Sequence, residues 1–292
     1  MLDMPTKTEK EKAAVSVEAW RVEFREAADN VPADAIKITG PRRLTAELRA
    51  LDAANVFAPT APQSSDSFTI VWIPPSAKAS VGIERDAEAW LRDGQAAGNG
   101  AVVRAGVRTV RIFWAFNRAL IYAGAENVSS ALDAVVRFTV AQRETIALES
   151  EMRSTWAAIE VDAPLTHSIT RRQLRRQSHV NVMTVTATRM KAKFLRITQA
   201  LEQLDPLLED TSKRIYAELV LAGALHDRLE LLEDPVQFAL ENYEIANSRL
   251  TEAKFAYKEQ SRARVSFTLE AAIAVLEAAI VAVLVYPFHL FW

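Results

Sequence analysis

Glycine almost disappears from the second half of the chain, and this depletion constrains the fold more than any other feature of the sequence. After Asn127 the only glycine is Gly223, and runs of β-branched and aromatic residues nearly vanish. Because glycine interrupts helices and β-branched runs favour strands, a stretch that lacks both favours long helices. The sequence therefore predicts a helical region that begins at about residue 127.

Prolines predict where these helices end, because proline cannot continue the backbone hydrogen-bond ladder of a helix. Ser129 or Ser130 is placed to cap the first helix, since a serine hydroxyl accepts a bond from a free backbone N–H. Pro164, Pro206 and Pro235 are expected to end the first three helices. The predicted helices cover residues 131–159, 168–204, 215–232 and 236–286.

The second predicted helix has the clearest periodicity in the chain. Its apolar residues are separated by three and four positions in turn: Val180, Met183, Ala187, Met190, Phe194, Ile197, Leu201 and Leu204. This heptad seam is the pattern that knobs-into-holes packing requires. We therefore expect antiparallel or coiled-coil packing of this helix, either within one subunit or between subunits.

Residues 15–126 predict a small α+β domain, preceded by a disordered leader at residues 1–14. β-branched and aromatic residues cluster in FTIVWIPP, VRTVRIFWAF and RALIYAG, which begin at Phe68, Val107 and Arg118. Such segments are typical of strands, and the short gap between the last two predicts a hairpin or a bent ribbon. Helices are predicted over residues 16–30, 41–55 and 82–94.

The composition excludes several kinds of chemistry. The chain has no cysteine, which excludes disulfides, thiolate chemistry and cysteine-based metal sites, and its net charge of −2 gives no bias towards nucleic acid. No nucleophile motif or phosphate loop occurs. The four histidines lack the spacing of a metal site: His167, His179, His226 and His289. We therefore expect no enzyme activity, no cofactor, no metal and no small-molecule substrate.

Basic residues gather near the start of the second helix and along it. Four of them form a tight cluster: Arg171, Arg172, Arg175 and Arg176. Three more recur at helical spacing: Arg189, Lys193 and Arg196. In one interpretation they form the solvated flank of a coiled coil, paired with acids such as Glu202 or Glu209 on neighbouring helices. In the other, the four-arginine cluster binds the phosphates of anionic lipid or RNA, although no interleaved aromatic residues support single-strand recognition.

Residues 266–292 are as apolar as a membrane span, although they contain Glu270 and Glu277. A spanning helix needs about 20 apolar residues, so the length suffices. Three basic residues lie just upstream, and aromatic residues gather at the other end: Lys258, Arg262 and Arg264, then Tyr286, Phe288, Phe291 and Trp292. Positive charge stays on the cytoplasmic side and aromatic rings favour the interface. This pattern predicts a C-terminal helix that crosses the inner (cytoplasmic) membrane once. A soluble core helix in a tight oligomer and an amphipathic interfacial helix remain as alternatives.

The repeat LEAAIAVLEAAIVA has a period of seven and places small and acidic residues on one stripe of the helix. The stripe contains Glu270, Ala271, Ala274, Glu277 and Ala278. Small residues allow helices to approach closely in lipid. A glutamate buried there requires a partner, and a second copy of the same helix is the nearest source. We therefore expect a homo-oligomeric bundle of these helices.

Two segments of the C-terminal part resemble the required-for-meiotic-nuclear-division family. The first is LELLEDPVQF, residues Leu229–Phe238, followed by Tyr243 and Arg249–Leu250, and the second is LEAAIAVLEAAI, residues Leu269–Ile280. Members of this family are mitochondrial inner-membrane proteins with bacterial relatives. The resemblance implies a membrane-anchored scaffold that assembles as a homo-oligomer, and it implies no catalytic residues.

These observations predict a non-enzymatic, membrane-anchored oligomeric scaffold whose body lies on the cytoplasmic side. Its parts would be the α+β domain at residues 15–126, a helical stalk at residues 127–265 and a transmembrane helix at residues 266–292. The alternative is a membrane effector or channel-forming assembly, in which the bundle opens a path beside the glutamate stripe.

Overall fold

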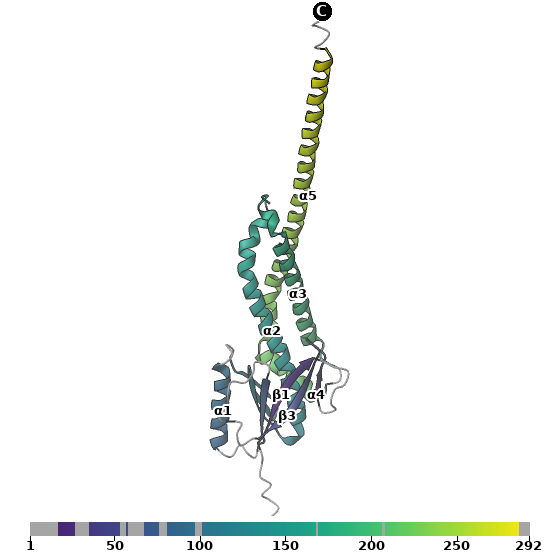
Figure 1. Ribbon diagram of the computed structural model, residues 1–292. Coiled ribbons are helices and arrows are strands. Elements are labelled where there is room, and N and C mark those ends of the chain that lie inside the picture. Colours follow the sequence, from purple (N-terminus) through teal and green to yellow (C-terminus); the bar gives the residue numbers. More distant parts are fainter. Residues whose placement is uncertain are drawn as a thin grey trace, which may run out of the picture. The chain divides into compact units, whose positions relative to one another are not determined.

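The computed structural model describes most of the chain, and Figure 1 shows it as a ribbon. The described residues are 17–26, 35–52, 57, 67–75, 81–96, 101–167, 169–205 and 208–285. The chain divides into two compact units: Met1–Glu151 with Ala192–Asp234, and Met152–Lys191 with Pro235–Trp292. The leader predicted at residues 1–14 lies outside the described ranges.

The first unit contains a seven-stranded sheet with the strand order β2-β3-β1-β4-β7-β6-β5. The strands are β1 (Glu18–Glu26), β2 (Ile36–Ile38), β3 (Leu44–Leu51), β4 (Ser67–Ile73), β5 (Val103–Val107), β6 (Val110–Ala115) and β7 (Arg118–Tyr122). Neighbouring strands are antiparallel, except that β4 and β7 run parallel. The predicted strand at Phe68 and the hairpin of β6 and β7 are confirmed. The strand predicted from Val107 is divided, because a turn at Arg108, with a φ of 52°, separates β5 from β6.

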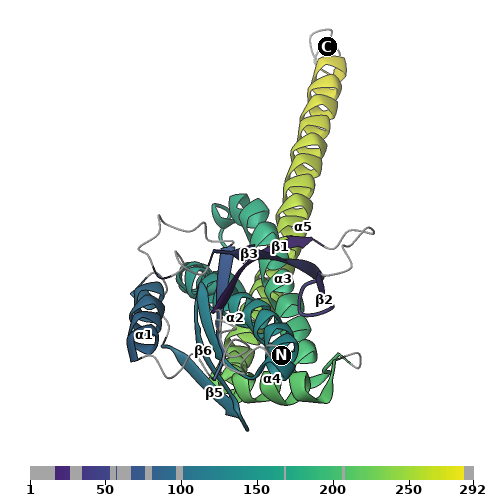
Figure 2. The same ribbon diagram turned by 90° about the horizontal axis from the view of Figure 1, so that it is seen from below.

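Helices pack on both faces of this sheet. On one face, Ala87, Trp90 and Leu91 of α1 (Val81–Ala96) join a core with buried residues of β4 and β7. On the other face, the indole of Trp114 in β6 donates to the hydroxyl of Thr139 in α2 (Val128–Asp162) at 2.9 Å. Figure 2 shows α1 and α2 on opposite sides of β6. Alternate residues of a strand point to opposite faces of the sheet. Because helices cover both faces, the central strands are apolar on both. The helix predicted over residues 82–94 is confirmed as α1.

The helices predicted over residues 16–30 and 41–55 are wrong, because these segments contain the strands β1 and β3. In β1, apolar and charged residues alternate strictly from Trp20 to Arg25, which is the period of a strand. The two strands pair antiparallel, and Arg25 forms a cross-strand ion pair with Glu47 at 3.2 Å. Local helix preference in these Ala- and Glu-containing segments is therefore outweighed by burial against the sheet and by cross-strand pairing.

The C-terminal helices are α2, α3 (Gln177–Glu202), α4 (Asp210–Ala222) and α5 (Leu225–Val285). α2 ends just before Pro164, as predicted. The prediction that Ser129 or Ser130 caps α2 is wrong, because the helix already begins at Val128. The Ser130 hydroxyl instead donates to the carboxylate of Glu209 at 2.7 Å. α3 begins later than predicted, after a 3-10 turn at Gln173–Arg176.

The prediction that Pro235 ends a helix is also wrong, because α5 runs through it for 61 residues. The break lies instead between α4 and α5, where Ala224 has a positive φ of 49°. Gly223 is required at this break, since a Cβ there would lie 2.9 Å from the ring of Phe138. Proline removes one backbone donor from a helix. α5 nevertheless continues past Pro235, with Val236 and Ala239 buried in the next turn. The uninterrupted helix predicted from Val236 is confirmed as far as Val285.

The heptad seam of α3 is confirmed as the buried side of that helix. Six of its eight residues are buried: Val180, Ala187, Met190, Phe194, Ile197 and Leu201. In the second unit, the side chain of Gln177 donates to the hydroxyl of Thr251 at 3.0 Å, and that of Thr184 donates to the carbonyl of Tyr243 at 3.4 Å. Residue numbers rise along α3 as they fall along α5, so the two helices pack antiparallel.

The fold is therefore α+β, with the sheet in the N-terminal half and a mostly helical C-terminal half, as predicted. Over the ranges that the structure describes, no helix is both long enough and apolar enough to cross a membrane. The span predicted at residues 266–292 continues past Val285 into residues outside those ranges.

Candidate functional site

A buried carboxylate at the end of α2 joins three segments of the second unit. Asp162 is 0% exposed. Its Oδ1 forms an ion pair with the guanidinium of Arg176, and its Oδ2 lies 3.0 Å from Nε2 of His179. The phenol of Tyr243 in α5 donates to the same Oδ2 at 3.3 Å. Burial, and then the Asp162 charge, raise the pKa of Tyr243. A buried charge is costly unless it is paired, so these contacts make a carboxylate tolerable at this position.

The four predicted arginines therefore do not share one environment. Arg176 is partly buried and is held by Asp162, whereas the other three are exposed: Arg171, Arg172 and Arg175. None of these three has an ion-pair partner among the residues that the structure describes. The sequence predicts Arg176 in a surface cluster because its partner, Asp162, lies on the other side of the break between α2 and α3. No local pattern signals that contact.

The basic residues along α3 also differ from one another. The ammonium of Lys193 lies 3.1 Å from Glu151 and 3.5 Å from Glu144, both on α2. The acids suggested by the sequence, Glu202 and Glu209, are not its partners. The guanidinium of Arg196, one turn further along α3, has no acidic partner in the described part of the chain.

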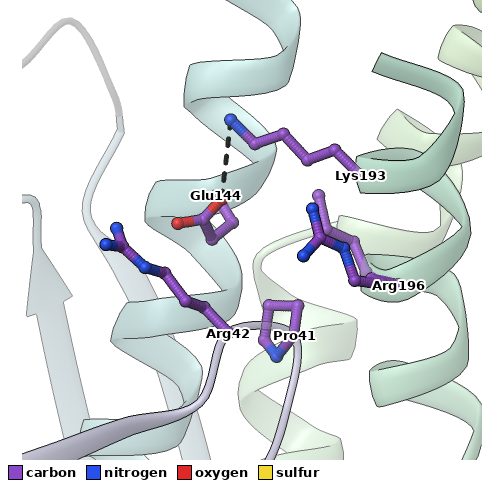
Figure 3. Close-up of a pocket in the computed structure, with 6 residues that line it drawn as sticks. Pro41, Arg42, Glu144, Lys193 and Arg196 are labelled. Carbon is purple, nitrogen blue, oxygen red and sulfur yellow. Dashed lines mark ion pairs between the residues drawn. The ribbon is translucent and has the colours of Figure 1, made fainter. Parts of the chain in front are cut away.

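A polar groove lies in the first unit, where the loop between β2 and β3 meets α2 and α3. One part, ≈ 280 Å³ in volume, is lined by Pro41, Arg42, Glu144, Lys193, Arg196 and Ile197. Figure 3 shows Arg42 of the loop and Arg196 of α3 on either side of Glu144 in α2. A second part of ≈ 900 Å³ shares Arg42 and Arg196 and adds Arg43. We refer to both parts together as the Arg42–Arg196 groove.

The second half of α5 is bare of contacts from other described segments. Every residue from Lys258 to Val281 is exposed. Eight of them are large and apolar, each at least 50% exposed: Val265, Phe267, Leu269, Ile273, Val275, Leu276, Ile280 and Val281. Glu270 and Glu277 lie seven residues apart on this regular helix and so share one face, offset by about 20°. Ala271, Ala274 and Ala278 lie beside them on the same turns.

The remaining candidates for chemistry do not converge. Within the described ranges, no group of three or more His, Asp or Glu side chains could hold a metal ion. His179 is a partner of Asp162, and His167 and His226 lie on different segments. His289 lies outside the described residues.

Comparison with known proteins adds no assignment. No model of a known protein family matches the chain, and no characterised protein matches it. The resemblance to the required-for-meiotic-nuclear-division family stays a prediction. The function is therefore inferred from the geometry of the chain's own residues.

Proposed function

We propose that this chain is a non-enzymatic, membrane-anchored scaffold that assembles as a homo-oligomer through the C-terminal part of α5. The observation that carries the proposal is the uncovered apolar surface of that helix between Val265 and Val281. Soluble proteins rarely leave a continuous apolar surface of this kind in water. A lipid bilayer is the occupant that we propose for it.

The distribution of apolar residues around α5 supports a bilayer rather than a single protein groove. A helix that docks in a groove presents one apolar stripe, whereas a helix that is apolar nearly all round is surrounded by core or by lipid. Leu269, Ile273 and Ile280 lie on one side of the helix, while Phe267 and Val275 point well away from it. The apolar sequence continues from Val281 to Trp292, interrupted only by Pro287 and His289.

Magnitudes favour insertion despite the two glutamates. Transferring eight half-exposed large side chains out of water contributes on the order of 10 kcal/mol. Two acidic residues within a bilayer cost roughly 5–7 kcal/mol on insertion scales, and less if they pair. Lys258, Arg262 and Arg264 precede the apolar stretch and are exposed, as residues beside anionic headgroups would be.

The glutamate stripe supports assembly of several copies. Glu270 and Glu277 are exposed on the isolated helix, and the described residues offer Glu270 only the hydroxyl of Ser266, at 3.1 Å. In lipid, each carboxyl group would need a polar partner. The flanking alanines allow a second copy of α5 to approach closely enough to supply one.

Extraction of membranes with alkaline carbonate tests the anchor. Wild-type full-length chain is expected in the pellet, and a variant with Ile273→Lys and Ile280→Lys is expected in the supernatant. The matched control is Leu221→Lys with Leu231→Lys, because these leucines are 72% and 77% exposed but lie on α4 and in the first turns of α5, far along the chain from Val265. The control should stay in the pellet. Release of the wild-type chain by carbonate would remove the bilayer from the proposal.

The size of the chain in detergent tests the assembly. After correction for bound detergent, we expect a mass of two or more times that of the 32.4 kDa monomer. Replacing Ala271, Ala274 and Ala278 with leucine should shift the chain to monomers, since bulk on this stripe separates the helices. Leucine at Ala272 and Ala279, which lie nearly opposite Ala274 on the helix, provides a control of similar apolarity. A wild-type monomer would contradict the assembly.

The glutamate stripe also favours a second candidate, a membrane effector or channel-forming assembly. An acidic stripe that faces the interior of a bundle resembles the polar lining of a pathway. Release of a trapped dye from liposomes separates the two functions. A scaffold leaves the dye inside, whereas a channel releases it and loses this activity in a Glu270→Gln, Glu277→Gln variant.

A further inference from the structure

We propose that the Arg42–Arg196 groove binds a phosphomonoester group. This inference is independent of the proposed membrane anchor, because every contact that carries it lies within the first unit. The groove combines a firmly held loop, an excess of positive charge and a lining that suits one chemical class of ligand.

The loop that forms one wall is fixed against the helices that form the other. A Cβ added to Gly40 would lie 3.0 Å from the Cβ of Ala200, so the loop backbone approaches α3 closely. Arg137 of α2 donates to the carbonyl oxygen of Lys37 at 2.9 Å and forms an ion pair with Asp205 at 3.2 Å. The side chains of that ion pair are only 15% and 10% exposed. The guanidinium groups of the wall are therefore carried by a framework that needs little reorganisation on binding.

The charges that line the groove do not cancel. Four basic and two acidic side chains line its two parts: Arg42, Arg43, Lys193, Arg196, Glu26 and Glu144. Lys193 is paired with Glu144 at 3.5 Å and with Glu151, which does not line the groove, at 3.1 Å, and Arg42 contacts Glu26 at 2.7 Å. Arg43 and Arg196 have no acidic partner within the described ranges. Two guanidinium charges therefore remain for a ligand.

A phosphomonoester matches this arrangement in charge and in geometry. It carries about 1.5 to 2 negative charges near neutral pH and presents three acceptor oxygens. Arginine guanidinium groups bind such oxygens in a bidentate manner. A phosphodiester carries a single charge and only two non-bridging oxygens, so it can accept from fewer of the guanidinium donors. None of the described residues that line the groove is aromatic, so the bases of single-stranded RNA would find no ring to stack on.

The same phosphomonoester could come from a soluble phosphate ester or from the headgroup of phosphatidic acid. Titration calorimetry on the full-length chain in a neutral maltoside detergent, with glycerol 3-phosphate as the probe, tests the shared chemistry. Sedimentation with phosphatidylcholine vesicles that contain phosphatidic acid, compared with phosphatidylglycerol, tests the lipid source. A short RNA homopolymer is titrated as the competing macromolecule.

We expect saturable binding of glycerol 3-phosphate, weakened about tenfold or more by Arg43→Ala or Arg196→Ala, because each removes a charge-assisted contact. Arg189→Ala is the matched control, since Arg189 is exposed on the same helix but does not line the groove, and it should leave the affinity unchanged. Because Arg43 and Arg196 are exposed, these variants should fold normally, which circular dichroism checks. If phosphatidic acid retains the chain and glycerol 3-phosphate competes, the lipid is the source; if only the soluble ester binds, the source is soluble.

Three results would overturn the inference. The first is that neither glycerol 3-phosphate nor phosphatidic acid binds when its own concentration reaches the millimolar range. The second is an equal loss of affinity in Arg189→Ala and Arg196→Ala, which would indicate a diffuse charge effect. The third is RNA binding that glycerol 3-phosphate does not displace. The calorimetric results do not depend on whether α5 inserts into a bilayer, and the vesicle result is the difference between phosphatidic acid and phosphatidylglycerol, to which an inserted α5 contributes equally.

Discussion

Replacing Asp162 with asparagine should loosen the second unit by breaking a buried ionic contact. The substitution keeps the shape of the side chain but removes its charge and turns one acceptor oxygen into a donor amide. Asp162 is 0% exposed, and its two oxygens contact Arg176, His179 and Tyr243. Because both oxygens have a donor beside them, the NH2 group of asparagine must face at least one donor. The end of α2, the start of α3 with the turn before it, and the first third of α5 lose their common polar partner.

The expected cost follows from how exposed each partner is. Breaking a buried ion pair by removing one partner costs about 3–5 kcal/mol. Arg176 and His179 are 35% and 46% exposed, so solvent recovers part of their interactions. Tyr243 is fully buried and recovers none. We therefore expect a loss of about 3 kcal/mol in local stability for Asp162→Asn, at the lower end of that range. Tyr243→Phe, which removes one hydrogen bond, should cost about 1 kcal/mol.

Hydrogen exchange measured by mass spectrometry on the full-length chain in detergent gives the local free energies. Peptides from the end of α2 and from the part of α5 around Tyr243 should exchange about 100-fold faster in Asp162→Asn than in wild type. Glu160→Gln is the matched control, because Glu160 is exposed two residues earlier on α2. In a double-mutant cycle, Tyr243→Phe should cost almost nothing once Asp162 is already asparagine. Wild-type exchange in Asp162→Asn, or an equal cost of Tyr243→Phe in both backgrounds, would refute the reasoning.

Three further predictions concern the first unit. Burial raises the pKa of Tyr216 above its ordinary value of 10.0. The contribution of this phenol to folding stability should therefore be fully present below about pH 10 and be lost as the pH rises further. Urea titrations should show a smaller loss of stability at high pH in Tyr216→Phe than in wild type. An equal loss in both would exclude the phenol as its source. Gly223→Ala should lower stability by about 1–3 kcal/mol in thermal unfolding, because its Cβ meets the Phe138 ring at 2.9 Å. Gly106→Ala, whose Cβ meets only a carbonyl oxygen at 3.8 Å, should cost clearly less, and equal costs would contradict the steric account. The guanidinium of Arg143 lies over the rings of Phe24, Phe68 and Phe116, at 5.4, 5.7 and 5.4 Å from their centroids. Arg143→Met should therefore lower the free energy of unfolding in urea by about 1–3 kcal/mol. An unchanged midpoint would show that only the aliphatic part of the side chain contributes.

The contrast between α3 and β1 illustrates why the sequence predicts some elements and not others. The seam from Val180 to Leu201 repeats at a spacing that only a helix places on one face, and six of its residues are buried. β1 also alternates regularly, but its residues have a high helix propensity and its partners lie elsewhere. One of those partners is β3, and the other is β4. Because strand pairing depends on distant segments, local preference misled the prediction.

The candidate sites divide in the same way. The stripe of Glu270, Ala274 and Glu277 follows from a period of seven within one helix, and α5 carries it on one face. The partner of Arg176 could not be predicted, because Asp162 and Arg176 lie on opposite sides of a break between two helices. The sequence shows Arg196 only as part of a charged stripe, because nothing near it in the chain indicates the loop that carries Arg42.

The sequence by itself determined the helical second half, the buried seam of α3 and the apolar, acid-marked surface of α5, because these depend on residues a few positions apart in one helix. Tertiary structure alone decided that residues 18–26 and 44–51 are strands, that Pro235 lies inside a helix, and that Arg43 and Arg196 share a groove. The physical reason is that each of the latter outcomes depends on contacts between segments that are distant along the chain. Burial and pairing across such distances outweigh the local preferences that a sequence displays.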